Sequence, residues 1–304
     1  MLRRIVLAHI LGIALVCVVL LVPNKRTTAS PAFAMLIGIG ISELLYIVAL
    51  LSNKHKGTLP VGCTDIISFV WLLLLAWEIT ATKTGVAHPV LLPCPENVFY
   101  VFVTNGGELF QNVLSSLELL LSGFVLGLVF GVILGVICGW VPRLRQMFYP
   151  IANVFAPIPS VIFTPFLVIL MPNYRMAAVI VILLGVFWPQ FLNMILRVSS
   201  LPPAILDNTR TLKVNNITMV TKIILPYILP DVMKGVRVSL TTAFLMLMYA
   251  ESFGAKSGIG FWITNANLFA NYANIYAGII TCGITVTVLN YLTAWLQDKL
   301  SYWK

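Results

Sequence analysis

Long apolar runs separated by short polar connections make up most of the chain. The runs cover residues 5–22, 32–51, 66–80, 110–140, 147–171, 177–196, 233–251 and 276–297. A helix needs about 20 apolar residues to cross the hydrocarbon core of a bilayer. The pattern therefore predicts an all-α membrane protein, a polytopic helical bundle embedded in the lipid bilayer.

Composition supports this interpretation and argues against a soluble globule. Of the 304 residues, 60% are hydrophobic and only 10% are charged, which is too little polar surface for a soluble protein of this size. The net charge of +9 does not indicate a nucleic-acid partner, because the basic residues stand singly between apolar runs and form no patch.

The first apolar run, residues 5–22, allows two interpretations. It follows Arg3 and Arg4, and Ala32-Phe33-Ala34 imitates a cleavage site, as in a secretory signal. The run is longer than the usual signal core of about 7–15 residues, and the imitation opens a second apolar run. These features favour a pair of membrane helices within residues 1–52.

The fourth run carries a glycine at every fourth position, and the fifth run is interrupted by prolines. Since residues four apart lie on one face of a helix, the glycines predict a smooth groove for a closely packed neighbour. These glycines are Gly123, Gly127, Gly131, Gly135 and Gly139. Pro157 and Pro159 predict a broken helix, which is either a wall of a conduit or a simple kink within the bundle.

Two polar connections are long enough to carry structure of their own. Residues 81–109 contain prolines and glycines that predict a loop without a helix. Residues 197–231 predict a short amphipathic helix from Pro203 that lies on the cytoplasmic surface. Its predicted apolar side comprises Ile205, Leu206, Thr209, Leu212, Ile217 and Val220.

Charge predicts the orientation of the spans. If residues 197–231 are cytoplasmic, both termini are cytoplasmic, and most of the 19 lysines and arginines lie on that side, as the positive-inside rule requires. Lys25 and Arg26 fit this arrangement poorly.

The residues suggest transport rather than catalysis. The sequence has no GxxxxGK[ST] phosphate-binding loop and no Ser/His/Asp constellation, so energy must come from another subunit or from an ion gradient. Five cysteines without a CxxC pair and three scattered histidines imply neither a disulfide nor a metal, and no cofactor is indicated. Glu118 and Glu251, at the ends of spans, are candidates for the solute path, although Glu251 could also cap a turn or pair with Lys256.

Several motifs, taken in order, resemble the permease subunit of ABC importers of the nitrate, sulfonate, taurine and bicarbonate group. They are Leu92-Pro93-Cys94-Pro95, the glycine-rich fourth run, Phe187-Trp188-Pro189, the box Asp207-Asn208-Thr209-Arg210-Thr211-Leu212-Lys213 with Leu225-Pro226, and Ala250-Glu251 with Gly254–Gly260. The box corresponds to the EAA loop of that family, although Lys213 replaces the family's glycine, so a shallower bend is expected there.

The resemblance implies a type I importer permease of six core helices, residues 53–304, with the first two helices as an added pair. It implies a non-catalytic subunit of the cell membrane with a second permease copy, identical or related, cytoplasmic ATPase subunits and an extracytoplasmic solute-binding protein. The loop 198–231 would couple to the ATPase. Its docking residues would be Asp207, Arg210, Leu212 and Lys213, anchored by Leu225 and Pro226.

Two alternatives stay open. A gradient-driven carrier or channel would need no ATPase, although the sequence shows no internal repeat of the kind common in such carriers. The altered box could also mark a degenerate partner in a heteromeric permease.

Overall fold

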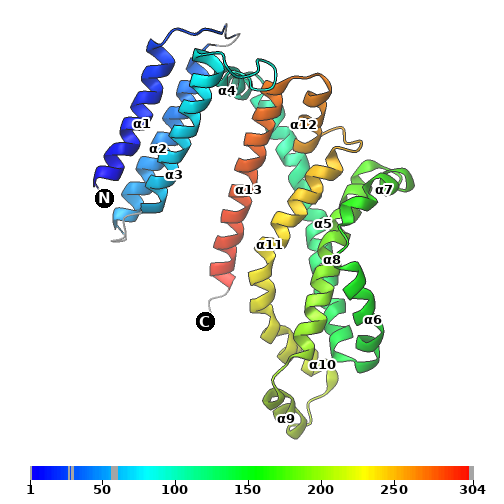
Figure 1. Ribbon diagram of the computed structural model, residues 1–304. Helices are drawn as coiled ribbons and strands as arrows, with labels where there is room; N and C mark the ends of the chain where they lie inside the picture. Colours follow the sequence, from blue (N-terminus) through cyan, green and yellow to red (C-terminus); the bar gives the residue numbers. More distant parts are fainter. Residues whose placement is uncertain (1, 27, 29–30, 56–60, 301–304) are drawn as a thin grey trace. The chain divides into compact units, whose positions relative to one another are not determined.

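The computed structural model describes residues 2–26, 28, 31–55 and 61–300, and this part of the chain is helical without any strand (Figure 1). The α-helices in chain order are α1 (Leu2–Leu21), α2 (Phe33–His55), α3 (Val61–Glu78), α4 (Pro95–Thr104), α5 (Gly106–Trp140), α6 (Pro142–Phe155), α7 (Thr164–Leu170), α8 (Tyr174–Ser199), α9 (Pro203–Thr211), α10 (Asn216–Thr218), α11 (Leu225–Glu251), α12 (Ile259–Leu268) and α13 (Tyr272–Leu300). Two π-helical turns, η1 (Ile79–Lys83) and η3 (Met219–Ile224), and the 3₁₀ turn η2 (Ser160–Phe163) complete the set.

The membrane-spanning pattern predicted from hydropathy is confirmed for seven of its eight apolar runs. Seven helical segments among the described residues are long and apolar enough to cross a membrane. An eighth span is possible if α6 and the η2–α7 segment, which are bent by 79° at a short break, count together. The break falls at Pro157 and Pro159, where the missing N–H groups end the regular helix.

Two boundaries differ from the prediction. Residues 81–109 were expected to lack a helix, but α4 forms there because Pro95 occupies the first turn, where a proline costs no hydrogen bond. The last helix before α12 was expected to begin at residue 233, but α11 begins at Leu225 with Pro226 in its first turn. In both helices a proline stands in the first turn, where its missing N–H costs no hydrogen bond.

The chain divides into two compact units, described separately below. One comprises Met1–Phe110 and Ile263–Ile280, and the other comprises Gln111–Trp262 and Thr281–Lys304. In the first unit α1 packs along α3 and α2 along α4. The buried core of this unit includes Leu15, Val19, Met35, Ile39 and Trp71.

In the second unit the glycine groove of α5 is filled by α8. A Cβ added to Gly123 would lie 2.6 Å from the Cβ of Ile182, and one added to Gly135 would lie 2.6 Å from the Cβ of Met194. The remaining glycines meet α8 in the same way, at Val186, Gln190 and Val198. The partners on α8 therefore also recur every four residues, and the two helices run in the same direction at backbone-to-backbone distance.

Candidate functional site

The loop between α8 and α11 contains two short helices that meet at a left-handed residue. After α9 ends at Thr211, Lys213 adopts a φ of 50° and turns the chain toward α10. Asn215 then caps α10, since its Oδ1 accepts the Thr218 N–H at 2.7 Å. The bend expected to be shallower with lysine is therefore made in the left-handed conformation that favours glycine.

The inner side of this loop belongs to the core of its unit. Leu206, Val214 and Val220 pack against a buried cluster drawn from α5, α8, α11 and the loop itself. The cluster comprises Val136, Met194, Val198, Leu201, Met219, Ile224, Ile228 and Val232. The loop therefore shares one close-packed core with α5, α8 and α11.

The outer side of the loop carries two large apolar side chains. Leu212 and Ile217 are 76% and 75% exposed. The sequence placed both on one side with Leu206 and Val220, and this prediction is wrong. α9 ends at Thr211, so Leu212 no longer follows the periodicity of that helix, and the left-handed Lys213 then turns the chain before Ile217.

The other predicted docking residues lie on α9, directly after it, or at the far end of the loop. Asp207 lies on α9 and is exposed, as is Lys213 after it. Arg210 also lies on α9, but its side chain is outside the described part of the structure. Leu225 and Pro226 open α11 at the other end of the loop, and Leu225 packs against the buried cluster.

An ion pair and a cavity mark the base of the loop. Arg197 Nη1 on α8 lies 2.8 Å from Asp231 Oδ2 on α11, so the loop is closed where it leaves and rejoins the long helices. A cavity of about 660 Å³ lies between the loop and the α5–α6 turn, with Trp140, Arg145 and Thr209 in its lining. The loop therefore rests on packed side chains at one edge and on open space at the other.

The residues predicted for a solute path lie on different elements. Pro157 and Pro159 lie at the break after α6 and are exposed. Glu118 is an exposed residue of α5 that forms an ion pair with Arg175 at the start of α8. A role for these residues in the path stays a prediction.

Glu251 ends α11 and is 1% exposed. Its Oε1 accepts the Ser116 hydroxyl at 2.7 Å, and its Oε2 accepts the Gly260 N–H at 2.7 Å in the first turn of α12. Gly258, with a φ of 122°, passes so close that a Cβ there would lie 2.3 Å from Glu251 Oε1. The carboxylate therefore fastens the α11–α12 connection to α5, and neither contact involves Lys256, the partner considered from the sequence.

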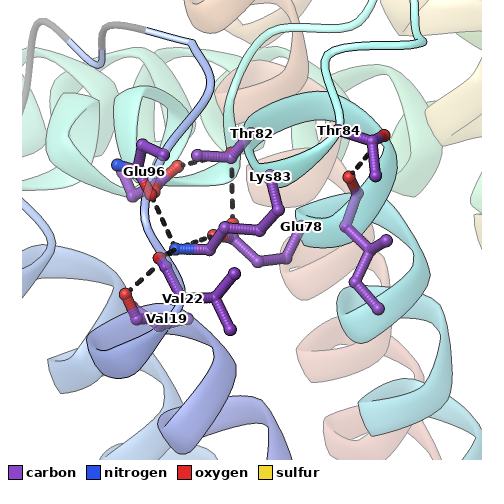
Figure 2. A network of polar contacts seen from close by, with 9 residues as sticks. Val19, Val22, Glu78, Thr82, Lys83, Thr84 and Glu96 are labelled. Carbon is purple, nitrogen blue, oxygen red and sulfur yellow. Dashed lines mark hydrogen bonds and ion pairs between the residues drawn. The ribbon is translucent and has the colours of Figure 1, made fainter.

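In the first unit, a buried lysine joins α1 to the end of α3 (Figure 2). Lys83 Nζ lies 3.1 Å from the carbonyl oxygen of Val19 and 2.9 Å from that of Val22. The same ammonium lies 3.3 Å from the Glu78 carboxylate, and the two side chains are 4% and 0% exposed. Lys83 thus satisfies free carbonyls at the C-terminal end of α1 while it pairs with a buried acid.

Further polar groups extend this network. Thr82 Oγ1 lies 3.2 Å from Glu78 Oε2 and 3.1 Å from Glu96 Oε2, and all three side chains are buried (Figure 2). The Lys25 and Arg26 N–H groups both donate to the Thr82 carbonyl, and the Arg26 side chain donates to the carbonyls of residues 87 and 92. Arg26, which fits the predicted orientation poorly, therefore has structural partners within its own unit.

The family of the chain follows from comparison with known proteins. The family of the binding-protein-dependent transport system inner membrane component matches residues 127–302, more than half of the chain, and the chain belongs to this family. The resemblance to an ABC importer permease is thereby confirmed. The relatives are transport permeases, a non-catalytic class of subunit.

Several curated permeases are similar over most of their length. The putative aliphatic sulfonates transport permease of Bacillus subtilis is 26% identical over 77% of this chain and 85% of its own. The taurine transport system permease of Escherichia coli is 25% identical over 82% and 91%. A nitrate import permease of Leptolyngbya laminosa is 23% identical over 84% and 92%.

A solved structure has the same fold. The inward-facing MetNI methionine ABC transporter contains a chain that matches with a TM-score of 0.51 at 20% identity. The match covers 67% of this chain and 96% of that chain. The predicted fold class, a type I importer permease, is confirmed by this likeness.

Proposed function

We propose that the chain forms the membrane path of an ATP-driven importer and couples to a cytoplasmic ATPase through loop 198–231. The solute is a small oxyanion of the sulfonate, taurine or nitrate class, or a related small organic nutrient. The relatives that carry these names support this class. The transporter contains two permease copies, cytoplasmic ATPase subunits and an extracytoplasmic binding protein, and both termini of this chain are cytoplasmic.

The observation that carries the proposal is the two-sided character of the loop. Leu206 and Val214 pack into the core, whereas Leu212 and Ile217 project outward without burial. Large apolar side chains exposed together on a polar loop are typical of a protein-binding surface. A partner that moved these two side chains would also move α5, α8 and α11.

This geometry suggests how the transport cycle reaches the membrane. ATP-driven closure of the ATPases displaces the loop, and the displacement changes the packing of the long helices so that the path opens outward. Hydrolysis resets it. Asp207, Arg210 and Lys213 supply polar and charged contacts around the apolar pair.

The test uses the whole transporter, co-expressed with its ATPase and binding protein. Leu212→Asp and Ile217→Asp should each weaken ATPase binding by about thirtyfold, the loss typical of a contact worth about 2 kcal/mol. Arg210→Ala should abolish uptake and solute-stimulated ATP hydrolysis, although the variant chain should still insert into the membrane. Leu268→Asp is the control, because Leu268 is 77% exposed but lies at the end of α12.

The outcomes separate the candidate functions. Normal uptake by the Leu212 and Ile217 variants would overturn the coupling role. Uptake by the purified chain alone would favour a gradient-driven carrier. Co-purification of a second, different permease would identify a heteromeric transporter.

A further inference from the structure

An open hollow lies between α6 and α8 beside two prolines. Its volume is about 420 Å³, and its lining contains the side chains of Asn153, Ala156, Pro157, Pro189, Leu192, Asn193 and Leu196. Pro157 follows the end of α6, and Pro189 lies within α8. The only side-chain polar groups in this lining are the two carboxamides, and the lining has no charged residue.

The residues next to each carboxamide are mostly apolar, whereas α6 carries Arg143 and Arg145 in its first turn and α8 carries Arg175 and Arg197 near its ends. In the part of the chain that the structure describes, neither Asn153 nor Asn193 has a hydrogen-bond partner. Asn193 lies six residues from the end of α8, which is about 9 Å at the rise of a helix. An amide without a partner is costly in hydrocarbon, so within a membrane these carboxamides need water, a neighbouring chain or a bound polar group.

Aromatic contacts pack α6 against α8 close to the residues that line this hollow. Phe155 of α6 stacks on Trp188 of α8, with ring centroids 4.8 Å apart and an interplanar angle of 18°. Phe148 also meets Phe191 edge to face at 6.2 Å. On α6, Phe148 and Phe155 lie on either side of Asn153, and on α8, Trp188 and Phe191 both precede Asn193. These contacts pack the two helices together next to the hollow before any solute arrives.

We propose that the hollow is a solute-binding half-site in which Asn153 and Asn193 donate hydrogen bonds to the oxygen atoms of a small oxyanion. This inference rests on the proposed function and identifies the residues of this chain that would bind the transported solute. Each carboxamide offers two N–H donors. Uncharged donors hold an anion without the strong attraction of a lysine or arginine, so the solute is released onward.

Cysteine accessibility tests the hollow without knowledge of the cargo. The five native cysteines are replaced by alanine, and Asn153→Cys, Asn193→Cys and Val154→Cys are compared in the whole transporter in lipid nanodiscs. The probe is the anionic reagent 2-sulfonatoethyl methanethiosulfonate. Val154 is the control, because it is 61% exposed on α6 but lies outside the lining.

We expect both asparagine positions to react about a hundredfold faster than position 154, since a charged reagent is excluded from hydrocarbon by about 2.5–3.5 kcal/mol. Equal, slow labelling at all three positions would overturn the proposal. Faster labelling by the trimethylammonium analogue than by the sulfonate would exclude an anion site.

Uptake measurements then test the carboxamides themselves. For whichever of taurine, methanesulfonate or nitrate the transporter carries, Asn153→Leu and Asn193→Leu should each lower kcat/KM about tenfold, as the loss of one hydrogen bond to a charged group predicts. Val154→Leu should leave it unchanged. Unaltered uptake by both asparagine variants in a working ATP-driven transporter would refute the half-site and leave the proposed function intact. Fast labelling at positions 153 and 193 in a transporter that does not couple to ATP would refute only the coupling role.

Discussion

Arg197 and Asp231 form an ion pair, 2.8 Å between Nη1 and Oδ2, across the two ends of the polar loop. Arg197 lies in the last turn of α8, and Asp231 lies in α11, where it also meets Lys234 at 3.2 Å. The pair joins the helix that leads into the loop to the helix that leads out. A force applied to the loop therefore acts on α8 and α11 together.

Charge reversal tests this link. Arg197→Asp and Asp231→Arg each place like charges together, and each should reduce uptake per ATP hydrolysed. The double reversal should restore most of it. Because both side chains are partly exposed, the pair itself should contribute only about 0.2–1 kcal/mol to folding, so unfolding temperatures should change little. A double variant that transports no better than either single one would show that the pair does not link the helices.

The α5–α8 contact predicts that one added methyl group is harmful. Gly135→Ala would place a Cβ 2.6 Å from the Met194 Cβ and 2.8 Å from the Phe191 carbonyl oxygen. Overpacking of this kind should lower the free energy of unfolding by about 1–3 kcal/mol. Thermal unfolding of the purified chain in lipid nanodiscs measures the effect.

Gly235→Ala is the matched control, because nothing lies within 4 Å of a Cβ added there. Gly235 lies inside α11, where alanine should stabilise the helix by about 1 kcal/mol. Equal effects at positions 135 and 235 would mean that helix propensity alone, and not contact with α8, determines the response.

The left-handed conformation of Lys213 predicts a gain from glycine. With a φ of 50°, lysine carries a steric cost of about 1–2 kcal/mol that Lys213→Gly removes, partly offset by the greater entropy of glycine in the unfolded chain. We expect slower hydrogen exchange of the amides in α9 and α10. Lys222→Gly, in the helical turn η3, should instead accelerate exchange, because glycine weakens a helix. Faster exchange in both variants would contradict the argument.

The sequence predicted the spans and the close packing of the fourth run, but not how surfaces are paired. Hydropathy is a property of each helix alone, so the spans could be located. The glycine spacing predicted a groove, yet α8 became identifiable as its occupant only from the structure. In the loop, helical periodicity placed Leu212 with Leu206, but α9 ends at Thr211, before Leu212. The turn at Lys213 follows, and both Leu212 and Ile217 are exposed.

The buried network of the first unit was missed for a related reason. Glu78 and Lys83 are five residues apart, a spacing that does not bring side chains together in an α-helix. The π-helical turn η1 changes the period and makes the pair possible. An acid and a base five apart at the end of an apolar run would have been the signal. Asn153 and Asn193 were also missed, although isolated amides beside prolines in apolar runs could have indicated them.

Removal of Lys83 should destabilise the attachment of α1. Lys83→Met leaves the fully buried Glu78 carboxylate without its cation and the Val19 and Val22 carbonyls without a donor. Breaking a buried pair in this way typically costs about 3–5 kcal/mol. Thermal unfolding in nanodiscs should show the loss, and Glu78→Gln in the Lys83→Met background should recover part of it by removing the uncompensated charge.

The control is Arg4→Met, which breaks the exposed pair between Arg4 and Asp65 and should change stability by less than about 1 kcal/mol. If Lys83→Met were no more harmful than Arg4→Met, the ammonium would not be what holds α1 to the end of α3.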